Sequence, residues 1–150
     1  MNESTDFPAC FHRVTIKGMC VRDGKLLLVR ESAKLSGKWE LPGGGLDFGE
    51  NIPEAFAREV DEEMGLKVSK MSSQPVYVWT HRYEKKRKME WFYSFVVAYR
   101  VEFADLAITP TDECEAIEFF SLEELRSLEL SGQMSDLLTV FKPEDFLGDF

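Results

Sequence analysis

The chain has 150 residues, of which 44% are apolar and 30% charged, and this composition is typical of one globular domain spanning residues 1–150. Its formal net charge of −9 argues against a nucleic-acid partner, because proteins bind that polyanion through Lys and Arg. No apolar run approaches the roughly 20 residues that cross a bilayer, and residues 1–8 lack the layout of a signal peptide, so we expect a cytoplasmic protein without a membrane partner.

The N-terminal part of the chain predicts a β-hairpin followed by a short extended segment. Residues 12–21 alternate apolar and polar side chains, which is typical of a half-buried strand. Asp23–Gly24 predicts a tight turn, and the apolar run 26–29 predicts the returning strand. Residues 39–41 predict a brief extended segment that ends before a proline.

A glycine-rich segment and a helix come next. The glycines in residues 43–49 predict a flexible loop, although their pattern is not that of a phosphate-binding P-loop. Asn51 is suited to cap a helix that has Glu54 at its third position, and Gly65 is suited to end it. The apolar residues of this helix recur every fourth position and predict a stripe that faces the core: Ile52, Phe56, Val60 and Met64.

The second half of the chain predicts three more strands and two more helices. Residues 75–83 and 89–103 are rich in β-branched and aromatic side chains, and they predict long strands joined by the charged turn 84–88. Residues 116–120 predict a short strand.

Two helical segments follow that short strand. Ser121 and Glu124 form a capping-box pattern that opens a helix to about residue 130. Residues 135–142 predict a weaker helical segment that Pro143 closes. Strands mixed with helices in this way predict an α/β fold, with a sheet flanked by helices.

The three cysteines, Cys10, Cys20 and Cys114, are odd in number and widely spaced. Such a pattern argues against a disulfide framework and against a zinc site. A reducing compartment is consistent with it.

The acidic residues of the predicted 52–64 helix fall into two groups. At about 100° per residue, Glu59 and Glu63 lie at the edge of the apolar stripe, whereas Glu54 and Asp61 point to water. Carboxylates one turn apart repel by roughly 0.2–0.5 kcal/mol on an open surface, and burial adds a desolvation cost. A divalent ion such as Mg²⁺ reverses that repulsion, because it prefers hard oxygen ligands. A solvated acidic face therefore explains the second pair well and the first pair poorly.

The glycine segment and the helix together resemble a known signature. Gly44, Glu50 and the run 58–66 (R-E-V-D-E-E-M-G-L) resemble the motif of the Nudix, or MutT-like, hydrolase family. The resemblance implies an α/β/α sandwich with a mixed β-sheet. It also implies metal-dependent attack by water on phosphorus in the pyrophosphate linkage of a nucleoside-diphosphate-X substrate. Such a substrate is a nucleoside triphosphate, a sugar nucleotide or a dinucleotide.

The resemblance implies the metal ligands as well. Glu59 and Glu63 would be the main ligands of Mg²⁺ or Mn²⁺, and Glu62 would be a further ligand or an acid–base group. The carbonyl of Gly43 would be an extra ligand. Bound cations would also reconcile an acidic protein with an anionic substrate.

Other residues are predicted to support catalysis. By resemblance, Arg58 would orient Glu62 or its neighbours, and Glu50 would support the site from behind. The general base is either a motif Glu or an acid outside the motif, for which Glu115 and Glu113 are candidates. A solvated acidic loop is the alternative interpretation of those two residues.

Residues 81–88 form a basic cluster in this acidic chain. Arg82 and Lys86 are candidate contacts to substrate phosphate, and Tyr83 stands where dinucleoside-polyphosphate hydrolases of the family carry a Tyr. A solvated hairpin tip and ordinary strand packing are the alternative interpretations.

Two other functions fit parts of the sequence. A non-catalytic nucleotide-binding regulatory module of the same fold would have no need for the complete set of motif residues, Arg58, Glu59, Glu62 and Glu63. Isomerisation of a prenyl diphosphate needs a Cys and a Glu placed for proton transfer to carbon, a context that the cysteines do not show. The family often forms homodimers, and the strand 89–103 is long enough to contribute to one.

Overall fold

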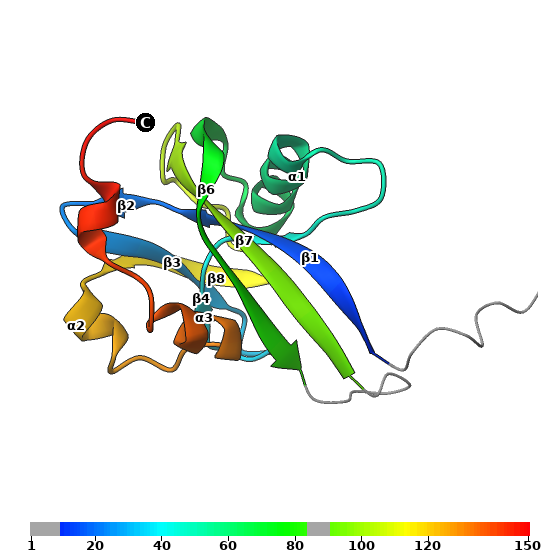
Figure 1. Cartoon of the computed structure of the whole chain (residues 1–150). Coiled ribbons are helices and arrows are strands. Elements are labelled where there is room, and N and C mark those ends of the chain that lie inside the picture. The colour runs from blue at the N-terminus through cyan, green and yellow to red at the C-terminus, as the bar shows by residue number, and fades with distance from the viewer. Residues whose placement is uncertain (1–9, 84–90) are drawn as a thin grey trace, which may run out of the picture.

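The computed structural model describes residues 10–83 and 91–150, and its strands form two sheets (Figure 1). The first sheet is mixed, because β1 pairs with β7 in parallel and its other pairings are antiparallel. Its strand order is β5 (Gly43–Gly45), β1 (Cys10–Met19), β7 (Trp91–Phe103) and β6 (Val68–Tyr83). A mixed sheet with flanking helices agrees with the predicted fold class.

The second sheet is antiparallel and centres on β3 (Lys25–Glu31). Strand β3 pairs with β2 (Val21–Arg22), β4 (Trp39–Glu40) and β8 (Cys114–Phe120). The turn between β2 and β3 has positive φ at Asp23 (52°) and Gly24 (74°), as the Asp-Gly pair predicted.

The helices lie on opposite sides of the strands (Figure 1). Helix α1 (Ile52–Met64) packs on β1 and β5, whereas α3 (Gly132–Leu137) packs on β4 and β6. Helix α2 (Leu122–Leu125) follows β8, and a 3-10 helix spans Pro143–Phe146. Within the described residues, none of the helices is long and apolar enough to cross a membrane.

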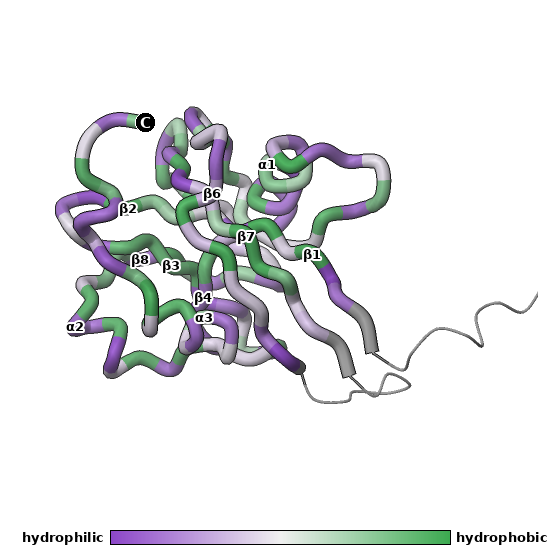
Figure 2. Tube along the Cα trace, in the orientation of Figure 1, coloured by the Kyte–Doolittle hydropathy of each residue, from purple (hydrophilic) through white to green (hydrophobic). Residues whose placement is uncertain are grey.

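Strand β3 divides the core into two layers. Leu27 and Val29 pack with α1, whereas the alternate residues Leu26 and Leu28 pack with the C-terminal helices. This alternation is what a strand buried on both faces requires. Figure 2 shows hydrophobic residues running along β3 and β7, between the two groups of helices.

The sequence correctly predicted α1 and both of its ends. Asn51 accepts a hydrogen bond from the backbone N–H of Glu54, and Gly65 ends the helix in the left-handed conformation with φ of 70°. Phe56, Val60 and Met64 are fully buried, and Ile52 packs against the same cluster. The predicted apolar stripe therefore holds α1 against the sheet.

The prediction of a flexible glycine loop was wrong over Gly43–Gly45. These glycines form β5, which pairs antiparallel with Thr15–Lys17 of β1. Their lack of side chains permits the pairing, because a Cβ on Gly43 would lie 2.2 Å from the carbonyl oxygen of Ile16.

The two C-terminal helices differ from their predicted bounds. Helix α2 ends at Leu125, not near residue 130, because residues 129–131 hydrogen-bond with the backbone of Trp39 instead. Helix α3 begins at Gly132, where the Ser131 side chain caps it, and it ends at Leu137. Strand β6 begins at Val68, earlier than the predicted 75, and the turn 84–88 lies outside the described residues.

Candidate active site

The acidic side chains of helix α1 differ in how far they are exposed to solvent. The side chain of Glu59 is only 18% exposed and Glu63 is half-buried, whereas Glu62 is 58% exposed. Asp61 and Glu54 face water, and Asp61 pairs with Lys67 at the surface. The predicted division of the acids into wet and half-buried groups is confirmed.

Arg58 holds several of these acids in place. Its Nε and Nη2 donate to both oxygens of Glu50, at 2.6 and 2.8 Å. Its Nη1 donates to Glu59 Oε1 at 3.0 Å and to Glu62 Oε2 at 3.2 Å. The bidentate contact lowers the pKa of Glu50 below its usual range. Arg58 thus fixes the orientation of two predicted ligands, and Glu50 in turn fixes Arg58.

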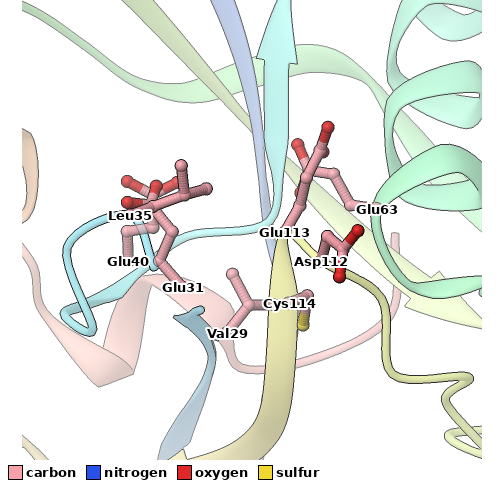
Figure 3. A pocket seen from close by; sticks show the side chains of 8 residues that line it. All are labelled: Val29, Glu31, Leu35, Glu40, Glu63, Asp112, Glu113 and Cys114. Carbon is pink, nitrogen blue, oxygen red and sulfur yellow. The ribbon is translucent and has the colours of Figure 1, made fainter. Parts of the chain in front are cut away.

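A cavity of about 270 Å³ opens beside the C-terminal half of α1 (Figure 3). Glu63 of α1 faces it, together with Glu40 of β4 and Glu113 from the loop before β8. The remaining lining residues complete an acidic wall with an apolar base: Val29, Glu31, Leu35, Asp112 and Cys114. Five of the eight lining residues are acids, so the cavity attracts cations.

The cavity changes the acid–base behaviour of Glu63. Burial raises the pKa of this carboxyl to about 8, and the charges of Glu40, Glu59 and Glu113 act in the same direction. The ammonium of Lys17 acts in the opposite direction. The surroundings of Glu63 therefore disfavour the charged form of its carboxyl.

The glycine strand β5 lies directly against the acids of α1. A Cβ on Gly44 would lie 2.5 Å from the carboxyl carbon of Glu59, so only glycine leaves room for this carboxylate. The carbonyl oxygen of the adjacent Gly43 accepts a hydrogen bond from Lys17 Nζ at 3.0 Å. An ammonium therefore contacts the oxygen predicted as an extra metal ligand.

The donors around the cavity suit a hard divalent cation. Carboxylates supply them, and both the burial of Glu63 and the neighbouring acids raise its pKa, so a cation bound there would favour its charged form. Across residues 10–83 and 91–150, no group of three or more His, Cys, Asp or Glu converges closely enough to hold a metal ion. The acids thus surround the space without meeting at one point.

The predicted general base lies elsewhere. Glu115 accepts a hydrogen bond from the backbone N–H of Ala33 at 2.8 Å and lies 3.8 Å from Arg30 Nε, and it does not line the cavity. Its neighbour Glu113 does line it. Glu113 lies in the loop before β8, whereas Glu115 lies within that strand, and only Glu113 lines the cavity with Glu63.

The predicted substrate contacts lie at the far end of β6. Arg82 is exposed and pairs in register with Tyr93, and Tyr83 is the last residue of the strand. Figure 1 shows this end of β6 well away from α1. Lys86 lies outside the described residues.

Sequence reasoning missed two residues of the site. Lys17 belongs to the polar side of the first strand, which was expected to face solvent, yet its side chain is only 6% exposed. Glu40 lines the cavity and lies 3.4 Å from Lys17 Nζ. No role was predicted for either residue, because both are placed by the packing of β5 and β4 against β1 and β3.

The sequence of this chain is similar to those of known proteins. The sequence profile described as the NUDIX domain matches residues 12–141. A MutT-like protein of Streptomyces ambofaciens is 45% identical over 67 residues, which are 44% of this chain and 41% of that protein. An ADP-ribose pyrophosphatase of Methanocaldococcus jannaschii is 41% identical over 54 residues, which are 35% of this chain and 32% of that protein.

A solved structure extends the likeness over the whole fold. The crystal structure of a MutT NUDIX hydrolase from Burkholderia pseudomallei has a TM-score of 0.66 and 27% sequence identity, and the alignment covers 87% of this chain and 98% of that one. The chain spans less than half the length of the two curated relatives. The similarity to those relatives is therefore a similarity of part of each protein.

Proposed function

Because the chain belongs to the Nudix family, we propose that it hydrolyses the pyrophosphate linkage of a nucleoside-diphosphate-X substrate, with Mg²⁺ or Mn²⁺ as its cofactor. In this reaction the oxygen of water forms a bond to one phosphorus, the bridging P–O bond breaks, and the other phosphate leaves with the bridging oxygen. The observation that carries the proposal is the half-buried pair Glu59 and Glu63: Arg58 holds the carboxylate of Glu59, and Glu63 lines the acidic cavity.

The charged residues of α1 that face the site are proposed to have separate roles in this reaction. Glu59 and Glu63, with Glu62, would hold the divalent ion, which neutralises phosphate oxygens and lowers the pKa of water when bound. Arg58 fixes the orientation of the carboxylates of Glu59 and Glu62, since its guanidinium is itself fixed by Glu50. Phosphoryl transfer depends mostly on positioning and charge stabilisation, which this arrangement supplies.

Glu113 is the better candidate for the general base. It faces the cavity with Glu63, where it can accept the proton of an attacking water. Glu115 has a structural contact instead, because it binds the backbone N–H of Ala33. We therefore assign the proton transfer to Glu113 in place of Glu115.

Residues 81–88 are proposed to bind a substrate phosphate that lies away from the linkage under attack, because the end of β6 lies well away from α1. Arg82 and Lys86 would supply positive charge, and Tyr83 would pack against the substrate. Charge reversal of Lys85, Lys86 and Arg87 should raise KM if this is correct. An unchanged KM would leave the cluster as a solvated hairpin tip.

We propose that two copies of the chain form a homodimer through the exposed apolar residues of the first sheet. Val14, Phe95 and Val78 are 37%, 40% and 50% exposed, and their register places them on one face of neighbouring strands. Sedimentation analysis of the wild type and of a Phe95→Glu variant would test this assembly.

A hydrolysis screen tests the proposed function. Nucleoside triphosphates, sugar nucleotides, dinucleotides and diadenosine polyphosphates would be assayed with Mg²⁺, and ADP-ribose belongs in the panel because the name of one relative specifies it. We expect cleavage of at least one class, loss of activity in excess chelator, and loss in Glu59→Gln. Strong turnover in excess chelator would contradict the proposed cofactor.

A further inference from the structure

Lys17 is buried in the wall of the acidic site. Its side chain is only 6% exposed, and it lies on β1 directly opposite Gly43 of β5. A buried ammonium is unfavourable unless oxygen partners compensate its lost hydration. Its position therefore reflects a specific set of contacts.

Three oxygens surround the ammonium of Lys17. Its Nζ donates to the carbonyls of Gly43 and Leu41, at 3.0 and 3.1 Å, and lies 3.4 Å from Glu40 Oε1. An ammonium has three N–H donors, and carbonyl and carboxylate oxygens are also the ligands that a hard metal ion takes. Lys17 thus sits in an oxygen environment suited to a cation.

The same oxygens connect Lys17 with the cavity. Glu40 lines the cavity beside Glu63, and Gly43 is followed by Gly44, against which the Glu59 carboxylate rests. The described lining residues of the cavity include five acids and neither Lys, Arg nor His. The charge of Lys17, just behind this wall, therefore compensates part of the acidic charge.

Lys17 and a divalent ion would compete for one position. An ion bound to the Gly43 carbonyl at about 2.1 Å would come within about 5 Å of an ammonium on the same oxygen. Like charges at that separation repel strongly, because the surroundings are partly desolvated. Either the ion avoids this carbonyl or the lysine must leave it.

We propose that the positive charge of Lys17 weakens the binding of divalent cations in the adjoining cavity. Its ammonium binds the Gly43 carbonyl and the Glu40 carboxylate, which a metal ion could otherwise use as ligands. Gly43 is then not a metal ligand while Lys17 is in place. An anionic substrate offsets the charge of Lys17, so metal and substrate bind better together than the metal binds alone. This inference rests on the proposed function, since it concerns the ion that the reaction uses.

Manganese binding by the metal-free protein tests the inference. Mn²⁺ would be titrated into wild type, Lys17→Met and Lys17→Gln, and free Mn²⁺ followed by its electron paramagnetic resonance signal. Met removes both the charge and the donor, whereas the amide of Gln keeps a donor without charge. We expect both variants to bind Mn²⁺ about tenfold more tightly than wild type, because a neighbouring positive charge is removed.

A matched control separates this effect from a general change in charge. Lys67→Met removes an exposed lysine near the C-terminal end of α1, where Lys67 pairs with Asp61, and it should leave the Mn²⁺ affinity within about twofold of wild type because exposed charges are well screened. A purely structural lysine would lower thermal stability without tightening metal binding. If Lys17→Met does not fold, the Lys17→Gln variant decides.

The outcomes distinguish this inference from the proposed function. Folded Lys17 variants with unchanged or weaker Mn²⁺ affinity would overturn the role of Lys17, even if wild type hydrolyses its substrate. A wild type that neither binds Mn²⁺ nor hydrolyses any member of the nucleotide panel, with variants that behave alike, would overturn both. Tighter binding in both Lys17 variants, with Lys67→Met unchanged, would support the inference.

Discussion

The two acidic faces of α1 have the same residue types and different surroundings. Glu59 is half-buried against Gly44 and Glu63 lines the cavity, and Arg58 and Lys17 are the nearby positive charges. Asp61, one residue away from Val60, is 51% exposed and pairs with the 71% exposed Lys67. The pair at the surface contributes little to stability, because solvent screens both charges.

This contrast shows what distinguishes the proposed site from an ordinary acidic helix face. Charge alone does not distinguish the two faces, since both carry carboxylates. The face that carries Glu59 and Glu63, here called the inner face, differs from the outer face that carries Asp61. Phe56, Val60 and Met64 anchor the inner face against the sheet, and Gly44 leaves room for Glu59. Burial makes the repulsion between carboxylates costly, and a cation then has a large favourable effect.

The largest expected effect separates the two faces directly. Glu63→Gln should lower kcat at least about a thousandfold, since the loss of an outer partner of a metal ligand alone costs about 10- to 100-fold. Asp61→Asn should keep near wild-type kcat. Steady-state rates with the best substrate at saturating Mg²⁺ give the comparison. Equal losses in both variants would remove the distinction between the faces.

The second comparison sharpens the assignment of the base. Glu113→Gln should lower kcat by about a hundredfold or more, within the range of general-base catalysis, because it faces the cavity. Glu115→Gln should stay close to wild type, because its carboxylate binds Ala33 instead. A pH–rate profile of both variants is the measurement, and a large loss confined to Glu115→Gln would reverse the assignment.

The third comparison concerns Arg58, which orients the carboxylates of Glu59 and Glu62. Arg58→Lys should lower kcat by about 10- to 100-fold, because an ammonium cannot make the bidentate contact with Glu50 while also holding Glu59 and Glu62. Lys67→Met removes the partner of the exposed Asp61 and is the matched control, and the kcat of this variant should equal that of wild type. A fully active Arg58→Lys enzyme would mean that these carboxylates need no fixed orientation.

The fourth comparison uses the stability of the metal-free protein. Burial raises the pKa of Glu63 to about 8 from the ordinary 4.5, so the folded protein binds this proton more tightly than the unfolded chain does. The free energy of unfolding should therefore fall as pH rises from about 4.5 to about 8. Urea unfolding across this range should show the decline in wild type and a flatter curve in Glu63→Gln. Parallel curves would contradict the proposed environment of Glu63.

Local sequence patterns were sufficient to predict the helix and the position of its acids. Asn51, Gly65 and the four-residue recurrence of apolar side chains define α1 without any distant contact. The same periodicity separates Glu63 from Asp61 correctly. These features depend on neighbours within one or two turns, which the sequence displays directly.

The features that sequence reasoning missed depend on distant pairing. Gly43–Gly45 becomes a strand only because β1 offers hydrogen-bonding partners, and that pairing also buries Lys17 beside Gly43. The helix expected to reach about residue 130 stops at Leu125, since the chain turns to pair with Trp39. Tertiary contacts override local propensity in each case.

A crystal structure of the protein soaked in Mn²⁺, with the ion located by its anomalous scattering, tests the central claim most directly. We predict manganese bound between the carboxylates of Glu59 and Glu63, with Glu62 turned toward it and Asp61 still paired with Lys67. Carboxylate oxygens of Glu59 and Glu63 that extend into bulk solvent, with no ion near either residue, would contradict the account.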